Sequence, residues 1–125
     1  MIINTSPPLI EEINKEVYDL VFKESANKIC FDCSKPYPKY SSINHGILIC
    51  EICNEKHKEL GNAVSFVKSL NDQWDEYLLS FILRGGNKRF KEALNYYEIY
   101  PMETGIDNVY KSKAAEYYRK MVFII

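Results

Sequence analysis

The sequence lacks a long apolar run, and it opens without a basic stretch followed by an apolar one. A membrane-spanning helix needs about 20 consecutive apolar residues, and a secretory signal needs a basic and then an apolar segment. We therefore expect neither a membrane span nor a leader. The cysteines form close pairs, which suits thiolates on a metal in a reducing compartment, so the sequence predicts a cytoplasmic protein.

An excess of positive charge is also missing, because 16 basic residues face 17 acidic ones. Domains dedicated to DNA or RNA are usually strongly basic. The composition therefore predicts no nucleic-acid partner, although a local basic patch on a neutral protein stays open. No internal repeat or low-complexity linker interrupts the 125 residues, a length that predicts one domain.

What the chain does have is a quartet of cysteines, Cys30, Cys33, Cys50 and Cys53, in the pattern Cys-x2-Cys-x16-Cys-x2-Cys. Each pair supplies two thiolates from a tight turn, and the two pairs together match the ligands of one tetrahedral zinc ion. Four thiolates leave no open position for an activated water, so this zinc is predicted to be structural and not catalytic. His57 is an alternative ligand in place of one cysteine.

Apolar spacing and turn residues predict short strands among helices. Extended segments are expected at residues 47–49 and 65–70, and helices at 6–25, 53–60, 71–85, 89–97 and 109–125, with a loop at 100–105. Ser6 is the expected cap of the first helix, and Asn71 or Asp72 that of the third. The predicted fold class is α+β, a small zinc-finger domain with a short central sheet surrounded by helices. An N-terminal helix at 1–26 is expected to pack on a zinc domain at 27–125.

A second motif follows the last cysteine pair and consists of His57, Lys58, Leu60 and Gly61. With the quartet, it resembles the zinc-finger domain of GTPase-activating proteins for the Arf family of small GTPases (ArfGAPs), where His-Arg-x-Leu-Gly stands at this place. Other segments that are similar to the family pattern are 44–50, 65–70, Trp74, Gly86-Asn87 and 110–119. The resemblance covers about residues 27–120.

The resemblance implies that the chain is a GTPase activator, not an enzyme with its own substrate. In the family an arginine supplied to the partner stabilises charge on the transferred phosphate. Lys58 occupies that arginine-finger position here, and Lys68 replaces a second family arginine. Lysine keeps one charge but loses the planar fork that holds two phosphate oxygens. Glu55, where the family has a small glycine, lowers the local positive potential.

These departures leave two interpretations. One is a domain that binds the GTP form of an Arf-family small GTPase and stimulates hydrolysis weakly or not at all, with Lys58 as the catalytic position. The alternative is a non-catalytic protein-binding module of the same fold. Either reading implies a cytoplasmic protein recruited to a peripheral membrane surface at the Golgi or other trafficking membranes, with vesicle trafficking as its setting.

A third class, a GATA-like DNA reader, uses nearly the same cysteine spacing. Such readers carry a basic helix after the second cysteine pair. Here Glu51, Glu55 and Glu59 interrupt that region, so DNA binding is not expected.

Overall fold

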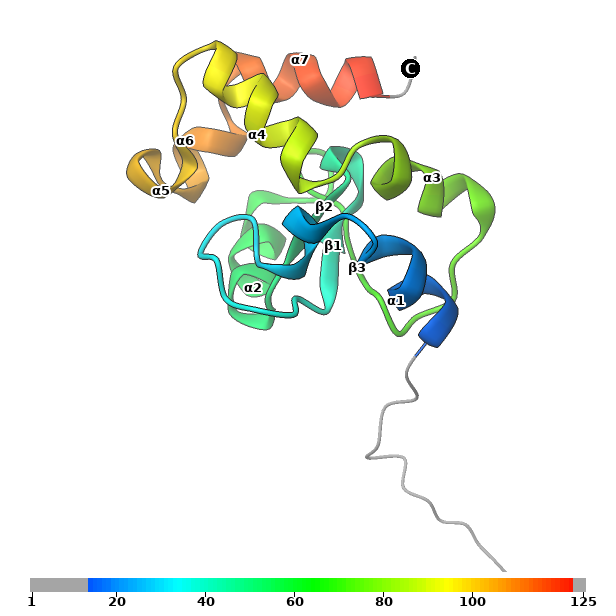
Figure 1. Cartoon of the computed structure of the whole chain (residues 1–125). Coiled ribbons are helices and arrows are strands. Elements are labelled where there is room, and N and C mark those ends of the chain that lie inside the picture. Colours follow the sequence, from blue (N-terminus) through cyan, green and yellow to red (C-terminus); the bar gives the residue numbers. More distant parts are fainter. Residues whose placement is uncertain (1–13, 123–125) are drawn as a thin grey trace, which may run out of the picture.

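A computed structural model describes residues 14–122, and the expectations for residues 1–13 and 123–125, including the Ser6 cap, lie outside this part (Figure 1). The helices are α1 (Lys15–Val21), α2 (Glu51–Leu60), α3 (Glu76–Arg84), α4 (Asn87–Tyr96), α5 (Pro101–Thr104), α6 (Ile106–Tyr110) and α7 (Lys113–Val122), with short 3-10 turns η1 (Ser25–Lys28) and η2 (Ile43–His45). The strands are β1 (Tyr40–Ser42), β2 (Ile47–Ile49) and β3 (Val67–Ser69).

The three strands form one antiparallel sheet in the order β2-β1-β3. Ser41 of the central strand lies opposite Leu48 on one side and opposite Lys68 on the other. The predicted extended segments are confirmed as β2 and β3. The central strand β1 was not predicted, because Tyr40-Ser41-Ser42 lacks the apolar alternation that marks a strand in sequence.

Two apolar clusters lie on either side of β2, because successive side chains of a strand point to opposite faces. Leu48 packs with Val17 and Val21 of α1 and with Ile82 of α3. The larger cluster, on the other face, is built around Phe90, Tyr110 and the apolar residues next to the zinc ligands. Figure 1 shows α4, α6 and α7 together on one side of the sheet and α1 beside α3. The predicted α+β class is confirmed.

Several predicted boundaries are wrong, each for a local reason. Helix α1 ends at Val21 and not near residue 25; within the described residues it begins at Lys15, where the Asn14 side chain accepts a hydrogen bond from the Val17 amide and caps it. Helix α3 begins after Asp75, whose carboxylate accepts from the Leu78 amide at 2.8 Å, and not after Asn71 or Asp72.

The C-terminal third also differs from the prediction. The expected loop at 100–105 contains the four-residue helix α5, with Pro101 at its first position, where a missing amide proton costs nothing. The expected single helix from Val109 is two helices. Ser112 separates them, because its hydroxyl donates to the Val109 carbonyl at 2.6 Å and accepts from the Ala115 amide at 3.1 Å.

Gly46 brings the turn η2 against α3. Its φ is +68°, and a Cβ there would lie 2.3 Å from the Phe81 carbonyl oxygen. Only glycine permits both the left-handed conformation and this approach. Within residues 14–122, no helix combines the length and the apolar character that crossing a bilayer requires.

Candidate functional site

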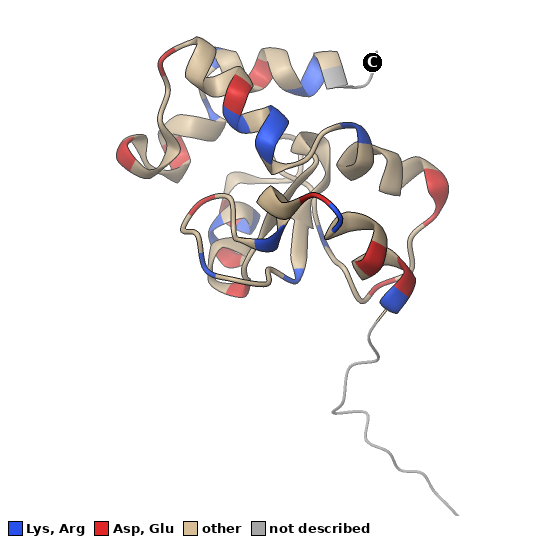
Figure 2. Ribbon diagram, viewed as in Figure 1, with Lys and Arg blue, Asp and Glu red and all other residues tan. Residues whose placement is uncertain are grey.

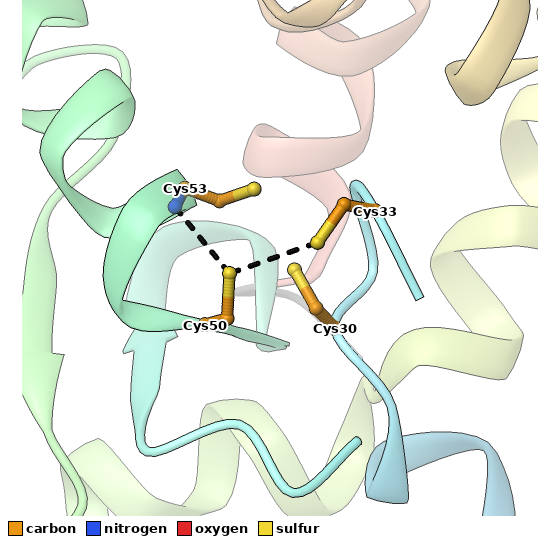
Figure 3. Close-up of side chains that lie close together, drawn as sticks. All are labelled: Cys30, Cys33, Cys50 and Cys53. Atoms are coloured by element: carbon orange, nitrogen blue, oxygen red, sulfur yellow. Dashed lines mark hydrogen bonds between the residues drawn. The ribbon is translucent and has the colours of Figure 1, made fainter. Parts of the chain in front are cut away.

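The structure brings together the four cysteines that their spacing predicted as one site (Figure 3). Cys30 and Cys33 lie in the turn after η1, Cys50 caps α2, and Cys53 belongs to its first turn. The four sulfurs all lie within 4.8 Å of one another, and those of Cys33 and Cys50 are 3.7 Å apart. Tetrahedral zinc with bonds of about 2.3 Å sets its sulfurs about 3.8 Å apart. The cluster therefore fits zinc.

The protonation chemistry of these thiols also fits a bound cation. Burial raises the pKa of Cys30 to about 12, and burial together with the charge of Cys30 raises the pKa of Cys53 further. At Cys50, burial acts upward, but hydrogen bonds from the Cys53 amide and the neighbouring thiols lower the pKa overall. Buried thiolates need a positive partner, and a zinc ion is one that four thiolates can hold.

His57, the alternative ligand, lies outside this cluster. Its Nε2 is 2.7 Å from the Asp32 carboxylate and its Nδ1 is 2.6 Å from the Ser65 hydroxyl. Both ring nitrogens are therefore engaged elsewhere. The His57 side chain is completely buried on the inner face of α2.

Lys58 is the next residue of α2, and it points away from the core. Its side chain is 55% exposed, and its Nζ lies 3.3 Å from the Glu55 carboxylate. One helix thus fixes the buried imidazole of His57 and presents the neighbouring cation to solvent. Cys50 and Cys53 of the cysteine cluster lie at the N-terminal cap and in the first turn of the same helix.

A groove of about 300 Å³ runs beside Lys58, between α2, β3 and the start of α3. Residues that line it include Tyr40, Asn54, Lys58, Phe66, Lys68 and Asp72. Lys68 is held more tightly than Lys58. Only 18% of its side chain is exposed, its Nζ is 3.6 Å from the Asp72 carboxylate, and it lies 5.6 Å from the centre of the Trp74 ring. The groove thus places two cations where an anionic group of a partner can reach them.

Asn87 is a structural residue of this region that the sequence marked only through the similarity of Gly86-Asn87 to the family pattern. Its Oδ1 accepts from the Leu48 amide at 2.8 Å, and its Nδ2 donates to the carbonyls of Ala26 and Ile29 at 2.9 and 2.8 Å. It therefore joins α4 to β2 and to the chain just before Cys30. Its partners are 39 to 61 residues away, so no local pattern indicates this role.

Comparison with known proteins agrees with this geometry. A family model described as "Putative GTPase activating protein for Arf" matches residues 15–125. ADP-ribosylation factor GTPase-activating protein 3 of Bos taurus is 33% identical over 99 residues, which are 77% of this chain and 19% of that protein. ADP-ribosylation factor GTPase-activating protein AGD12 of Arabidopsis thaliana is 41% identical over 75 residues, 58% of this chain and 22% of that protein.

A solved structure has a similar fold. It is described as "Crystal structure of putative GTPase activating protein for ADP ribosylation factor" from Cryptosporidium parvum, and it superimposes with a TM-score of 0.80. The two chains are 23% identical, and the match covers 88% of each. The chain spans about a fifth of the length of the two curated relatives described above. The family match over residues 15–125 shows that this chain belongs to the ArfGAP family.

Proposed function

We propose that this domain binds an Arf-family small GTPase in its GTP form and presents Lys58 to the nucleotide of that partner. The observation that carries the proposal is the position of Lys58, exposed on the helix that the zinc cluster anchors, at the edge of a groove that also holds Lys68. In the proposed reaction, water attacks the γ-phosphorus, the bond between this phosphorus and the β–γ bridging oxygen breaks, and GDP and phosphate leave. The chain itself holds no nucleotide.

The role of Lys58 in this reaction is to offset negative charge on the γ-phosphate oxygens. An arginine finger increases the rate by about 10³ to 10⁵ and holds two oxygens through its planar fork. The lysine ammonium is a point charge, so we propose that it provides only a fraction of this effect. The Glu55 carboxylate, 3.3 Å away, competes with the phosphate for the same cation.

A second candidate function is a binding module without catalysis. The ion pair between Glu55 and Lys58 favours it, because a cation that is already paired must leave its carboxylate before it can contact phosphate. In this version the groove still recognises the partner, and the hydrolysis rate of the partner does not change.

We propose that Cys30, Cys33, Cys50 and Cys53 hold one structural zinc ion. The four sulfurs complete a tetrahedral coordination sphere, so the metal stabilises the fold and has no open position for substrate. Cys50 also caps the helix that carries Lys58, so this cysteine connects the metal site directly to that helix.

We further propose a cytoplasmic location at trafficking membranes, reached through the Arf partner and a peripheral membrane surface. Figure 2 shows basic and acidic residues interspersed along the helices, which supports protein partners over nucleic acid. Near the start of α4, Lys88, Arg89 and Lys91 form a small basic group that suits an anionic lipid surface.

The test measures two quantities with zinc-loaded protein and a panel of Arf GTPases. We expect tighter binding to the GTP form than to the GDP form, and single-turnover hydrolysis that is accelerated weakly. Binding without acceleration supports the non-catalytic module. Equal affinity for both nucleotide forms across the panel contradicts the proposed recognition.

A further inference from the structure

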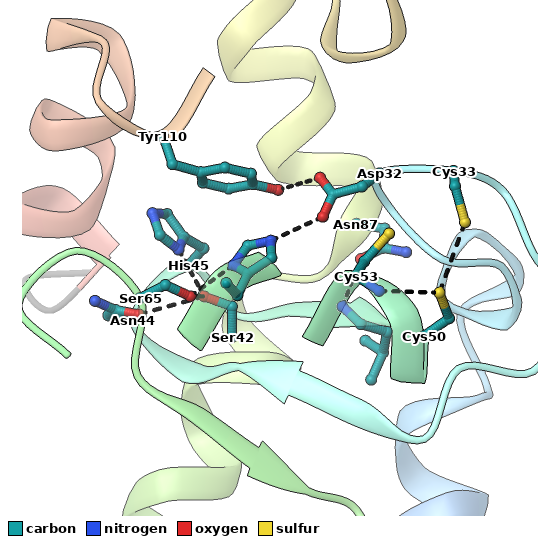
Figure 4. A network of polar contacts seen from close by, with 12 residues as sticks. Asp32, Cys33, Ser42, Asn44, His45, Cys50, Cys53, Ser65, Asn87 and Tyr110 are labelled. Atoms are coloured by element: carbon teal, nitrogen blue, oxygen red, sulfur yellow. Dashed lines mark hydrogen bonds and ion pairs between the residues drawn. The ribbon is translucent and has the colours of Figure 1, made fainter. Parts of the chain in front are cut away.

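Behind the groove lies a ring of polar side chains that the proposed reaction does not use. Its members come from six separate segments of the chain, and each side chain is bonded to the next, except that Arg119 bonds to the backbone carbonyl of Tyr110. In order they are Asp32, His57, Ser65, Ser42, His45, Arg119 and Tyr110. The Tyr110 hydroxyl donates to Asp32 at 2.6 Å and closes the ring. We call these seven residues the buried circuit; Figure 4 labels five of them.

The circuit is buried in the interior of the domain. Both imidazoles and both serines are fully buried, and the Asp32 side chain is 5% exposed. The Tyr110 ring packs edge-on against both imidazoles, with its centre 4.9 Å from His45 and 4.4 Å from His57. Inside a protein, hydrogen bonds of such a chain strengthen one another, and an unpaired member is costly.

Arg119 sets the direction of the circuit because a guanidinium can only donate. Its Nη1 donates to His45 Nε2 at 3.0 Å and to the Tyr110 carbonyl at 3.0 Å. His45 Nε2 must therefore accept, which places the ring proton on Nδ1. From there it donates to the Ser42 hydroxyl at 2.8 Å.

The Ser42 hydroxyl can donate its proton to either of two acceptors. The Ser65 hydroxyl lies at 2.7 Å, whereas the Asn44 carbonyl oxygen lies at 3.4 Å and already accepts from the Phe66 amide. The shorter contact is the better hydrogen bond. Ser65 then donates its own proton to His57 Nδ1 at 2.6 Å, and His57 Nε2 donates to Asp32 at 2.7 Å.

The pKa values of His45 and Tyr110, which lie near the two ends of the circuit, agree with this order of donors. Burial lowers the pKa of His45 well below its usual value, and the positive charge of Arg119 lowers it further. Burial and the charge of Asp32 raise the pKa of Tyr110, which keeps its hydroxyl protonated and able to donate. A positive guanidinium therefore starts the chain of donors and a carboxylate ends it.

We infer that the buried circuit is one polarised hydrogen-bond system, with His45 neutral and protonated on Nδ1 and His57 neutral and protonated on Nε2. His57 precedes Lys58 on α2, and Asp32 lies between Cys30 and Cys33. The circuit therefore connects α2 to the turn that carries Cys30 and Cys33, and also to α7. Asp32, His45 and Arg119 are thus positioning residues for Lys58. This last step rests on the proposed function, whereas the two tautomers do not.

Long-range nitrogen–proton NMR correlation spectra of the zinc-loaded chain test the inference, since they distinguish both tautomers and the imidazolium. The chain has two histidines, so the assignment is direct. We expect the Nδ1–H pattern for His45 and the Nε2–H pattern for His57 at neutral pH. An imidazolium at His57, or the same tautomer at both residues, overturns the inference whatever the domain does to Arf.

Variants of α7 test the coupling. Arg119→Met removes the hydrogen-bond donor to His45. We expect the His57 signals to shift in this variant, although Arg119 and His57 share no hydrogen bond. Lys120→Met, which removes an exposed cation next to Arg119, should leave them unchanged. Arg119→Lys, which keeps a donor, should retain the wild-type tautomers even if Arg119→Met fails to fold. Unchanged His57 signals in folded Arg119→Met, or altered tautomers in folded Arg119→Lys, contradict the coupling.

The proposed positioning of Lys58 is tested separately, by binding and hydrolysis measurements with Arf. We expect Arg119→Met to lower affinity for GTP-loaded Arf, or hydrolysis where it is measurable, by about three- to tenfold at full zinc occupancy. Arg119→Lys should recover most of this loss. If the tautomers are as inferred and both variants equal wild type with Arf, the circuit is structural and the positioning role is wrong.

Discussion

The buried circuit contains His57 of α2 and the exposed groove contains the neighbouring Lys58, and the two are held very differently. In the circuit, contacts between side chains are 2.6 to 3.0 Å long, and all of their groups except the partly exposed Arg119 are almost fully desolvated. In the groove, Lys58 and Lys68 meet carboxylates at 3.3 and 3.6 Å, and Lys58 is more than half exposed. The scaffold is thus fixed, whereas the Lys58 end can move to meet a partner. Substitutions in the buried part should lower the free energy of unfolding. Substitutions in the groove should change the affinity for the partner or its rate of GTP hydrolysis.

The largest expected effect is that of zinc removal. A strong chelator should abolish the cooperative thermal unfolding transition, because structural zinc contributes about 10–16 kcal/mol of apparent binding energy in small zinc domains. Circular dichroism during a thermal melt measures this. Added zinc should restore the transition, and a chelated chain that still unfolds cooperatively at the same temperature contradicts the structural role.

The next largest effect is expected from Asn87→Ala. The change leaves the Leu48 amide and the Ala26 and Ile29 carbonyls without a partner inside the protein. At about 1–3 kcal/mol for each buried group, the free energy of unfolding should fall by about 3–5 kcal/mol. Urea denaturation measures it. Asn95→Ala is the matched control on the same helix, since Asn95 Oδ1 has no hydrogen bond, and it should cost far less.

A smaller effect is expected from acid. Burial and the charge of Arg119 lower the pKa of His45 in the folded state, so the unfolded chain binds this proton first, near pH 6.5. The stability contributed by neutral His45 is complete above about pH 6.5 and is lost as the pH falls, by about 1 kcal/mol at pH 6. In an NMR titration of the folded protein, the midpoint of the His45 signals should lie well below pH 6.5; a midpoint near 6.5 contradicts this.

The smallest effect is expected from Glu55→Gln, which frees Lys58 from its exposed ion pair. The free energy of unfolding should change by less than about 0.5 kcal/mol, as for other surface pairs. Affinity for GTP-loaded Arf should rise about two- to threefold at low salt, and less at high salt. Glu59→Gln changes the same charge elsewhere on α2 and is the control; an equal gain there would mean that net charge alone is responsible.

The difference between the two faces also decides what could be predicted from the sequence. The clustering of the four cysteines, β2, β3 and the end of α2 at Gly61 follow from spacing and local residue preferences, and all are confirmed as structural features. That the cysteines bind zinc stays a prediction. Lys58 was found through its place in a motif. The division into residues 1–26 and 27–125 stays a prediction.

The buried circuit could not be predicted in this way. Tyr110 lies 78 residues from Asp32, and Arg119 lies 74 residues from His45, so their pairing depends on how α6 and α7 fold back. The position of Asp32 between Cys30 and Cys33 was the one feature of the sequence that could have drawn attention to this residue. The missed strand β1 has a related cause, because it contains two buried serines, and the Ser42 hydroxyl contacts Ser65, which lies 23 residues away.

The central claim is that a complete scaffold presents a lysine where the family has an arginine. Single-turnover GTP hydrolysis by Arf, measured with wild type and with Lys58→Arg at equal zinc content, tests it most directly. We expect Arf to hydrolyse GTP at least about tenfold faster with Lys58→Arg than with wild type, since the bidentate fork is restored on an unchanged helix. Equal rate constants for the two proteins would contradict this account.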